Sequence, residues 1–347
     1  MKVSLFHAIA VAATMAILPL QAGAQELSGK KIGIAAREIT NDYNRDIIAG
    51  AREVLEGAGA EIVVTDGGGD PRQHNENIEN LVNSGVAGII VQLGDAQQLA
   101  PVVAKANDAG IPVVTTSVGA TTAGALADVG GDDALMSAMM SRALLSSIDY
   151  KGDVYVFWVP GAPLLETRKR VLEAVAADYP QVTLHEVPTE HSVARVQTQM
   201  EDLLTANPAP GSIAAVWGAY DLLTSGAVEA IRRNGRTEIK AASIDGDRIG
   251  FQMLLDENSP FVATVVQDVP TIGSTAAEVL VEKLGGAEEF PSALYTDAWL
   301  AVRGNGVAAA EKRWGPQIWD ELGMDKADVE ARYPQDKDLV VIQPILP

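Results

Sequence analysis

From Lys30 onward, short apolar runs rich in Val, Ile and Ala recur at regular intervals along the chain. Stretches with the spacing of amphipathic helices separate them, such as Arg45–Glu56 and Asn75–Asn83. The runs are nearly continuous in apolar residues, which is typical of parallel strands that are covered by helices on both faces. The strands predicted in this first half are Lys31–Ala36, Glu61–Asp66, Ala87–Leu93 and Pro112–Thr116.

The same alternation resumes after a boundary near Gly130–Asp133. Strands are predicted at Asp153–Trp158, Thr183–Val187, Ile213–Trp217, Lys240–Ile244 and Phe261–Val266, and helices at Leu164–Asp178, Ala194–Ala206, Asp221–Asn234 and Thr271–Leu284. Strand-helix-strand units in series build a doubly wound sheet, so the pattern predicts an α/β protein with two Rossmann-like domains. After about Gly304 an amphipathic, Trp-containing tail is expected to pack over the surface.

The first two dozen residues follow a different pattern. Lys2 gives a short positive region, Ala8–Leu20 is apolar, and Ala22–Ala24 provides a small-residue cleavage site. These are the parts of a secretory signal peptide, which we expect at residues 1–24. The apolar run is too short to span a bilayer as a helix, so the expected product is exported and soluble. A buried N-terminal helix is the alternative interpretation.

Composition and charge narrow the location and the partners. The sequence contains no cysteine, which excludes disulfides, thiol catalysis, thiolate metal sites and a lipid-modified cysteine at the cleavage point. Together with a bacterial-looking signal peptide, this predicts the periplasm. The net charge of -20 is spread along the chain, which argues against nucleic acid or an anionic membrane as partner, because phosphate binding needs clustered Lys and Arg.

The candidate binding residues are those that directly follow the strands, because ligands of open α/β sheets lie outside the carboxyl ends of the strands. They are Asn41, Tyr43, Asn44, Ser117, Trp158, Arg168, His191, Trp217, Tyr220, Asp221, Asp245 and Gln267. Amides, a guanidinium and isolated carboxylates suit a neutral polyhydroxylated ligand, and aromatic rings cover the C–H faces of a sugar. Two positions keep alternatives, because Trp217 at strand spacing fits the core equally well and Asp221 fits an N-cap.

Enzyme motifs are missing from the sequence. It has no G-x-S-x-G elbow, no H-E-x-x-H and no P-loop. The glycine-rich Asp66–Asp70 lacks the dinucleotide-binding spacing and is interpreted as a turn, and Asp245–Asp247 lacks the rest of a calcium loop. No pair at the strand ends has the spacing of a nucleophile and its base. We therefore expect no enzyme activity, no cofactor and no metal site.

Seven segments follow one another in a familiar order: ITNDYNRDIIAGAR, GVAGIIVQLGD, NDAGIPVVT, TRKRVLEAV, DLLTANP, SIDGD and FVATVVQDVPTIG. In this order and spacing the chain resembles the ribose-binding-protein-like periplasmic solute-binding proteins, which are related to the sugar-sensing domains of lactose-repressor-type regulators. The resemblance implies the type I periplasmic binding protein fold, with two lobes joined by a three-strand hinge. It implies a first lobe of residues 28–131 and 268–290, a second lobe of residues 132–267 and 291–304, and a C-terminal extension of residues 305–347.

The resemblance also implies roles for single residues. Asn41 and Tyr43 match the amide and the stacking aromatic of the first loop, and Asn44 stands where a second aromatic is usual. The cleft arginine, the aspartate of the second domain and the hinge glutamine are matched by Arg168, Asp245 and Gln267.

Some positions depart from the sugar binders of this group. His191 falls where an aromatic is common, and Ser117-Val118 stands where an Asp-Arg pair is frequent. Tyr220 replaces the usual Asn before Asp, with Trp217 three residues earlier. The predicted pocket is therefore more aromatic and less charged than a ribose site.

Two functions follow from these observations. The first is the substrate-binding component of an ABC-type importer, expected to be a monomer that binds a monosaccharide or small sugar alcohol and delivers it to an inner-membrane permease by hinge closure. The second is a periplasmic sensor subunit for a two-component kinase, in which Tyr43, Trp158, Trp217 and Tyr220 form a cage for a sugar or a quaternary amine. Arg168 argues against a cationic ligand.

Overall fold

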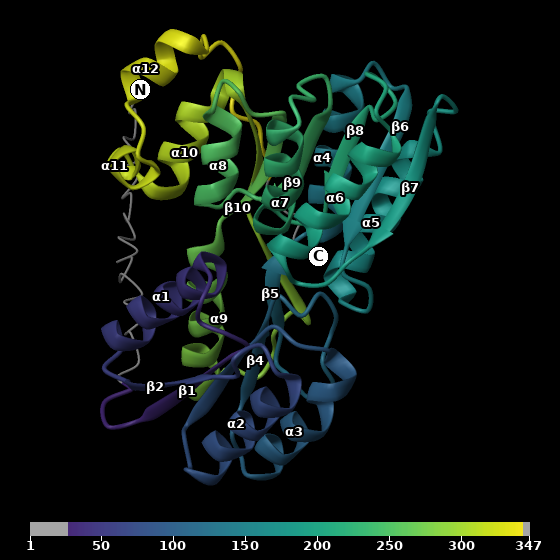
Figure 1. Ribbon diagram of the computed structural model, residues 1–347. Coiled ribbons are helices and arrows are strands. Elements are labelled where there is room, and N and C mark those ends of the chain that lie inside the picture. Colours follow the sequence, from purple (N-terminus) through teal and green to yellow (C-terminus); the bar gives the residue numbers. More distant parts are fainter. Residues whose placement is uncertain (1–26, 343–347) are drawn as a thin grey trace, which may run out of the picture.

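The computed structural model describes residues 27–342, which form two lobes (Figure 1). Each lobe is built around one sheet whose faces are covered by helices, so the α/β architecture of two doubly wound halves is confirmed. The signal peptide expected at residues 1–24 lies outside the described residues. Within residues 27–342, no helix is both long and apolar enough to cross a membrane.

The first lobe holds a six-stranded sheet in the order β11-β5-β4-β3-β1-β2, with every pairing parallel. Its strands are β1 (Lys31–Ala36), β2 (Glu61–Asp66), β3 (Gly88–Gln92), β4 (Val113–Thr116), β5 (Asp128–Gly131) and β11 (Ala293–Thr296). Its helices are α1 (Asp42–Gly57), α2 (Pro71–Asn83), α3 (Ala96–Asp108) and α9 (Val269–Leu284). Helices α1 and α9 bury their apolar sides against one face of the sheet, and α2 and α3 cover the other face.

Two glycines let α1 and α9 lie in direct backbone contact. A Cβ atom on Gly50 of α1 would lie 1.9 Å from the carbonyl oxygen of Pro270, and one on Gly273 of α9 would lie 1.9 Å from the carbonyl oxygen of Ile47. Any larger residue at either position would separate the helices. This close contact fixes α1 to the helix that begins directly after the second lobe.

The second lobe holds a seven-stranded sheet in the order β13-β12-β10-β9-β8-β6-β7. Its strands are β6 (Gly152–Trp158), β7 (Val182–Pro188), β8 (Ala215–Gly218), β9 (Lys240–Asp245), β10 (Phe261–Gln267), β12 (Ala298–Val302) and β13 (Val341–Ile342). The pairs β10–β12 and β12–β13 are antiparallel, and the other pairs are parallel. The helices that cover it are α4 (Asp133–Ser147), α5 (Pro163–Ala176), α6 (Val193–Ala206), α7 (Asp221–Arg233) and α8 (Arg248–Leu255).

The chain crosses between the lobes three times. The crossings lie between β5 and α4, between β10 and α9, and between β11 and β12. The last crossing corrects the boundary expected after residue 290, because β11 at Ala293–Thr296 pairs with β5 and belongs to the first sheet. The apolar pattern over residues 293–302 runs from one sheet into the other and does not mark where the chain crosses.

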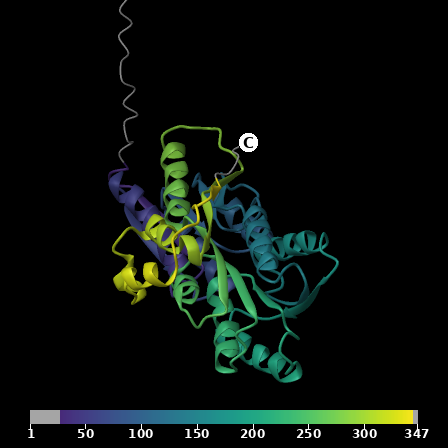
Figure 2. The same ribbon diagram turned by 90° about the horizontal axis from the view of Figure 1, so that it is seen from above.

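The C-terminal extension continues from the 3-10 turn η1 (Arg303–Asn305) into α10 (Gly306–Trp314), α11 (Ile318–Leu322) and α12 (Lys326–Arg332). Its apolar residues Ile318, Trp319 and Leu322 join the core of the second lobe that also contains Phe251 and Leu254. Figure 2, which looks down on the molecule, shows this yellow segment to one side of the second sheet. The extension then returns to that sheet and adds β13 at its edge, a strand that the sequence pattern did not predict.

Burial of His74 makes the stability of the first lobe depend on pH. The side chain lies in the first turn of α2 with 1% of its surface exposed, and this burial, helped by Arg37, lowers its pKa to about 4. In the unfolded chain a histidine titrates near 6.5. Between about pH 6.5 and pH 4, His74 is therefore protonated in the unfolded chain and neutral in the folded chain, so the free energy of unfolding falls as the pH falls.

We expect His74→Gln to weaken this acid sensitivity. The difference in free energy of unfolding between pH 7.5 and pH 5 should be smaller in the variant by on the order of 1–2 kcal/mol. Urea denaturation of both proteins at the two pH values measures it. Equal losses in wild type and variant would show that His74 does not carry the effect.

Candidate functional site

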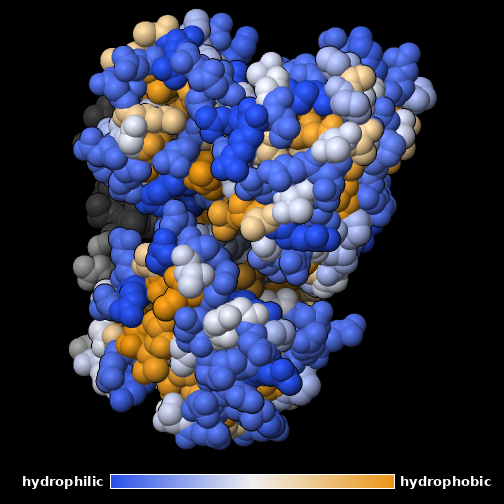
Figure 3. Space-filling view, viewed as in Figure 1, coloured by the Kyte–Doolittle hydropathy of each residue, from blue (hydrophilic) through white to orange (hydrophobic). Residues whose placement is uncertain are grey.

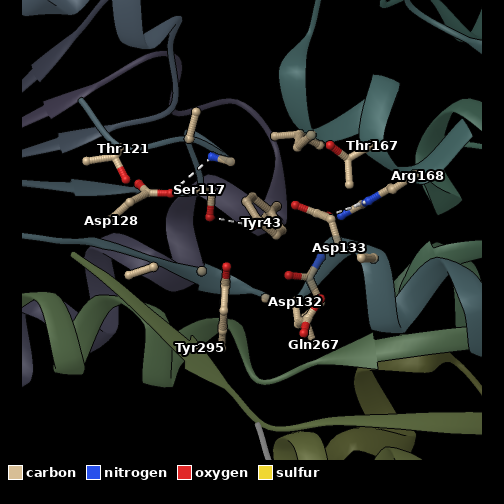
Figure 4. Close-up of a pocket in the computed structure, with 17 residues that line it drawn as sticks. Tyr43, Ser117, Thr121, Asp128, Asp132, Asp133, Thr167, Arg168, Gln267 and Tyr295 are labelled. Atoms are coloured by element: carbon tan, nitrogen blue, oxygen red, sulfur yellow. Dashed lines mark hydrogen bonds and ion pairs between the residues drawn. The ribbon is translucent and has the colours of Figure 1, made fainter. Parts of the chain in front are cut away.

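The surface is hollowed between the two lobes (Figure 3). Residues that follow parallel strands of both sheets lie there. A pocket of about 190 Å³ lies there. The first lobe contributes Tyr43, Ser117 and Asp128 to its lining, and the second lobe contributes Asp133, Arg168 and Gln267. Figure 4 shows the Tyr43 ring between Ser117 on one side and Arg168 with Asp133 on the other.

Arg168 organises the second lobe's side of the pocket. It lies on α5 with 3% of its surface exposed, and its Nε donates to Asp133 Oδ1 at 2.7 Å. Its Nη1 donates to the carbonyl oxygen of Ala219 at 2.7 Å and to Asp245 Oδ1 at 3.2 Å. Burial alone would lower the pKa of Arg168, but the two carboxylates outweigh it and the net shift is upward. The guanidinium is thus a fixed cation in the pocket wall.

Asp245 ends β9 in a strained conformation. Its φ of 122° lies in a region that non-glycine residues rarely adopt, which costs on the order of 1–3 kcal/mol. Besides the bond from Arg168, its Oδ1 accepts from Gln267 Nε2 at 2.7 Å. Burial raises the pKa of the Asp245 carboxyl, opposed by Arg168 and Gln267. The second lobe therefore presents a connected arginine, carboxylate and amide, and the strain at Asp245 is typical of a functional position.

Tyr43 and Ser117 meet on the first lobe's side. The Tyr43 hydroxyl and Ser117 Oγ share a hydrogen bond of 2.8 Å between residues 74 positions apart in the chain. Ser117 directly follows β4 with a φ of 54°, and burial raises the pKa of the Tyr43 hydroxyl. The tyrosine thus stays neutral and can exchange hydrogen bonds with a ligand.

Asp128 holds the turn that carries Ser117. Its carboxylate accepts from the backbone N–H groups of Val118 at 3.2 Å and Gly119 at 3.0 Å, and from the Thr115 hydroxyl at 2.8 Å. Burial raises its pKa to about 6. Asp128 is not among the predicted site residues, because β5 is short and glycine-rich and does not stand out as a strand in the sequence. Its position just before the predicted boundary at Gly130–Asp133 is the signal that could have found it.

Asn41 and Asn44 lie at the start of α1. Asn41 is the N-cap, and its Oδ1 accepts from the Asn44 backbone N–H at 2.9 Å. The Asn44 side chain is 1% exposed and, within the described residues, neither its nitrogen nor its oxygen has a hydrogen-bond partner. Two further buried atoms in the described part of the chain also lack a hydrogen-bond partner, Gln92 Oε1 at the end of β3 and Thr116 Oγ1 at the end of β4. Buried amides without partners are costly, so these groups are suited to bind a hydroxyl or a water.

His191 and Tyr220 pair at the edge of the second lobe. His191 Nδ1 lies 2.9 Å from the Tyr220 hydroxyl. Burial, and then the negative charges of Asp245 and Glu38, raise the pKa of Tyr220, and burial lowers the pKa of His191. Glu38 belongs to the loop between β1 and α1, so the strand-end loops of both lobes approach each other here.

The structure places both candidate tryptophans in the core of the second lobe. Trp217 is fully buried, and its Nε1 donates to Ser141 Oγ on α4 at 3.3 Å. Trp158 is 6% exposed, and its Nε1 donates to Glu166 at 3.3 Å. Neither lines the pocket. The expected aromatic cage is therefore wrong, because both faces of a parallel sheet are buried and a tryptophan at a strand end can point into either layer.

Asp221 is a structural carboxylate instead of a pocket residue. It is fully buried and accepts from the hydroxyls of Ser243 and Thr264 and from the Gly246 N–H at 2.8 Å. The alternative of an N-cap is also wrong, since Tyr220 occupies that position and no side chain caps the helix. Burial and the neighbouring aspartates raise its pKa well above the usual range. Asp221 joins α7 to β9 and β10.

Removing this carboxylate is expected to destabilise the second lobe. Asp221→Ala removes the acceptor of two buried hydroxyls and a carboxylate that also accepts from the N–H groups of Gly246 and Asp247, so the free energy of unfolding should fall by about 2–4 kcal/mol. Urea denaturation measures the change. The neighbouring Tyr220→Phe loses only the bond to His191 and serves as control. An Asp221→Ala protein as stable as this control would contradict the structural role.

The two-lobed fold and its interlobe pocket are those of a type I periplasmic binding protein. A family model described as "Periplasmic binding protein domain" matches residues 32–288. The chain belongs to this family, whose members are non-catalytic binding proteins.

Individual relatives make the assignment more specific. The ribose import binding protein of Bacillus subtilis is 25% identical over 257 residues, covering 74% of this chain and 82% of the relative. A xylitol-binding protein of Mycolicibacterium smegmatis is 25% identical and covers 64% of each chain. The structure of an ABC transporter solute-binding protein from Agrobacterium vitis with bound allitol is 27% identical, with a TM-score of 0.78 over 83% of this chain and 100% of its own. The protein is a solute-binding protein of a sugar ABC transporter.

Proposed function

We propose that the protein binds a monosaccharide or small sugar alcohol between its lobes and delivers it to an inner-membrane permease by hinge closure. The observation that carries the proposal is that Arg168 and Gln267 line one side of the pocket, opposite Tyr43 and Ser117 on the other. Both Arg168 and Gln267 donate to Asp245, which lies next to this lining. A ligand hydroxyl both donates and accepts, and this pocket offers groups of both kinds.

Each lobe supplies part of the binding chemistry. From the second lobe, Asp245 accepts from hydroxyls, and Arg168 and Gln267 hold that carboxylate in place and donate. From the first lobe, Tyr43 covers an apolar C–H face while the amide of Asn44 binds an edge. We assign secondary contacts at the edge to Asn41, Ser117, His191 and Tyr220.

The first lobe favours an acyclic polyol or a deoxysugar. Val118 is fully buried in the core and Asp128 is used by the turn, so no charged pair reaches the ligand from the end of β4. Hydroxyl recognition there rests on neutral groups, which adapt to an extended chain more easily than a rigid charged fork. The names of the relatives support this choice, since one binds xylitol and another was solved with allitol.

The same comparison supports a proposal for the location and the partners. We infer a periplasmic monomer from the signal-peptide pattern at residues 1–24 and from the periplasmic D-xylose-binding relative of Escherichia coli. The three crossings allow the lobes to rotate about a common hinge, and the permease would recognise the closed pair. A quaternary amine is not supported as the ligand of a sensor subunit, because Trp158 and Trp217 lie in the core and Arg168 is a cation.

A thermal-shift screen tests the ligand class. Pentoses, hexoses, deoxysugars and C4 to C6 sugar alcohols are added in turn to the purified protein. A ligand present at about 100 times its dissociation constant adds about 2.7 kcal/mol of stability, which raises the melting temperature by several degrees. A response to quaternary amines, with none to any sugar or polyol, would overturn the proposal.

Asp245→Ala tests the assignment of the site. The change removes the carboxylate that accepts from Arg168 and Gln267, so affinity for the ligand found in the screen should fall at least about tenfold by calorimetry. The matched control is Asp178→Ala, an exposed aspartate beyond α5 at the opposite edge of the sheet. Unchanged binding by a folded Asp245→Ala protein would move the site elsewhere.

A further inference from the structure

Arg313 connects the C-terminal extension to both lobes. It lies in the last turn of α10 with only 2% of its side chain exposed. Its Nη1 donates to the backbone carbonyl of Gln267 in the second lobe at 2.6 Å, and its Nη2 donates to Asp46 Oδ2 on α1 of the first lobe at 2.9 Å. One buried guanidinium therefore spans the boundary between the lobes.

A second arginine makes a parallel connection. Arg248, the first residue of α8, places Nη1 3.4 Å from Asp42 on α1 and Nη2 2.6 Å from Glu321 on α11 of the extension. Asp42 and Asp46 are four residues apart on α1, so both carboxylates lie on the same side of this helix. In Figure 1 the extension lies above α1 on the same side of the molecule. The first lobe thus offers two anions, and the second lobe with its extension offers two cations.

One aromatic ring of the extension holds both cations. The guanidinium of Arg248 lies 5.4 Å from the ring centre of Trp314, and that of Arg313 lies 5.0 Å from it. Phe251 packs against the same ring in a T-shaped arrangement. Both arginines therefore approach α1 from a rigid apolar support that α10 supplies.

The position of Arg313 relates this connection to the ligand site. Gln267 is the last residue of β10, directly before the chain crosses to α9, and its side chain donates to Asp245. Arg313 thus holds the backbone of a residue whose side chain belongs to the pocket.

The extension lies outside the part of the chain that the family model matches. The family match ends at residue 288, before α10, α11 and α12.

We propose that Arg313 is a positioning residue and that, with Arg248, it forms an ionic clasp to Asp42 and Asp46 that favours the closed arrangement of the lobes. The extension would then set the balance between open and closed protein before any ligand binds, and so contribute to affinity without touching the ligand. The inference rests on the hinge motion of the proposed function but not on the identity of the ligand.

The interlobe distance of the ligand-free protein tests the clasp. The chain has no cysteine, so Ala104→Cys on α3 and Ala194→Cys on α6, both exposed, give one spin-label pair across the lobes. In this background we expect Arg313→Met and Asp46→Asn each to raise the fraction of molecules at long distance about fivefold or more, the lower end of typical coupling between sites. The double variant should show the same fraction of molecules at long distance as Arg313→Met alone. Arg313→Lys should restore part of the population at short distance.

Arg303→Met is the matched control. Arg303 lies in the turn directly before the extension, and it donates to the carbonyls of Leu254, Asp256 and Ser259, all within the second lobe. We expect this variant to lower the melting temperature without changing the distance distribution. If Arg313→Met does not fold, Asp46→Asn still provides the test, because its side chain is 20% exposed and its loss is local.

Two results would overturn the clasp. One is an interlobe distance in Arg313→Met and Asp46→Asn no different from that in Arg303→Met, and the other is fully additive shifts in the double variant. Failure of the proposed ligand class would give a different result. The variants would then change the interlobe distance as expected, but no sugar or polyol would stabilise the protein in the thermal-shift screen.

Discussion

The buried guanidinium of Arg168 is the interaction on which the binding cleft depends. It neutralises Asp133, the first residue after a crossing between the lobes, and Asp245, the last residue of a central strand. The same group binds the carbonyl of Ala219. Loss of a buried charge from such a group leaves carboxylates without compensation, which is far more costly than loss of an exposed ion pair. One side chain therefore fixes the relative positions of three strand ends.

The distribution of charge limits the kind of solute. Asp128 and Asp133 in the pocket lining and the neighbouring Asp245 all have raised pKa values, with burial as the largest cause in each case. Arg168 is already shared between two of these carboxylates, so little positive charge remains for an anionic ligand. A phosphorylated or acidic sugar would meet this excess of carboxylates, whereas a neutral polyol meets groups that can both donate and accept.

Much of the fold could be predicted from the sequence, because parallel strands covered on both faces leave continuous apolar runs. The same property explains the errors at the site. In β8, Trp217 and its neighbours are apolar whichever layer they face, so spacing does not distinguish a cleft tryptophan from one packed on Ser141. Arg168 and Asp245 could be placed at strand ends, but their contact, and the bond between Tyr43 and Ser117, depend on the three-dimensional register of loops far apart in the chain.

The close contacts of Gly50 with Pro270 and of Gly273 with Ile47 have a mechanical consequence. Helix α9 starts directly after the crossing at Gln267, and α1 touches α9 backbone to backbone. Helix α1 is therefore packed rigidly against the helix that follows the crossing. A small rotation at the crossing is then transmitted without slack to the start of α1, where Asn41 and Tyr43 lie. The absence of a Cβ atom at Gly50 and Gly273 allows this tight helix packing and makes the first lobe stiff. The rate and extent of solute binding would then depend on that stiffness as well as on the groups that touch the solute.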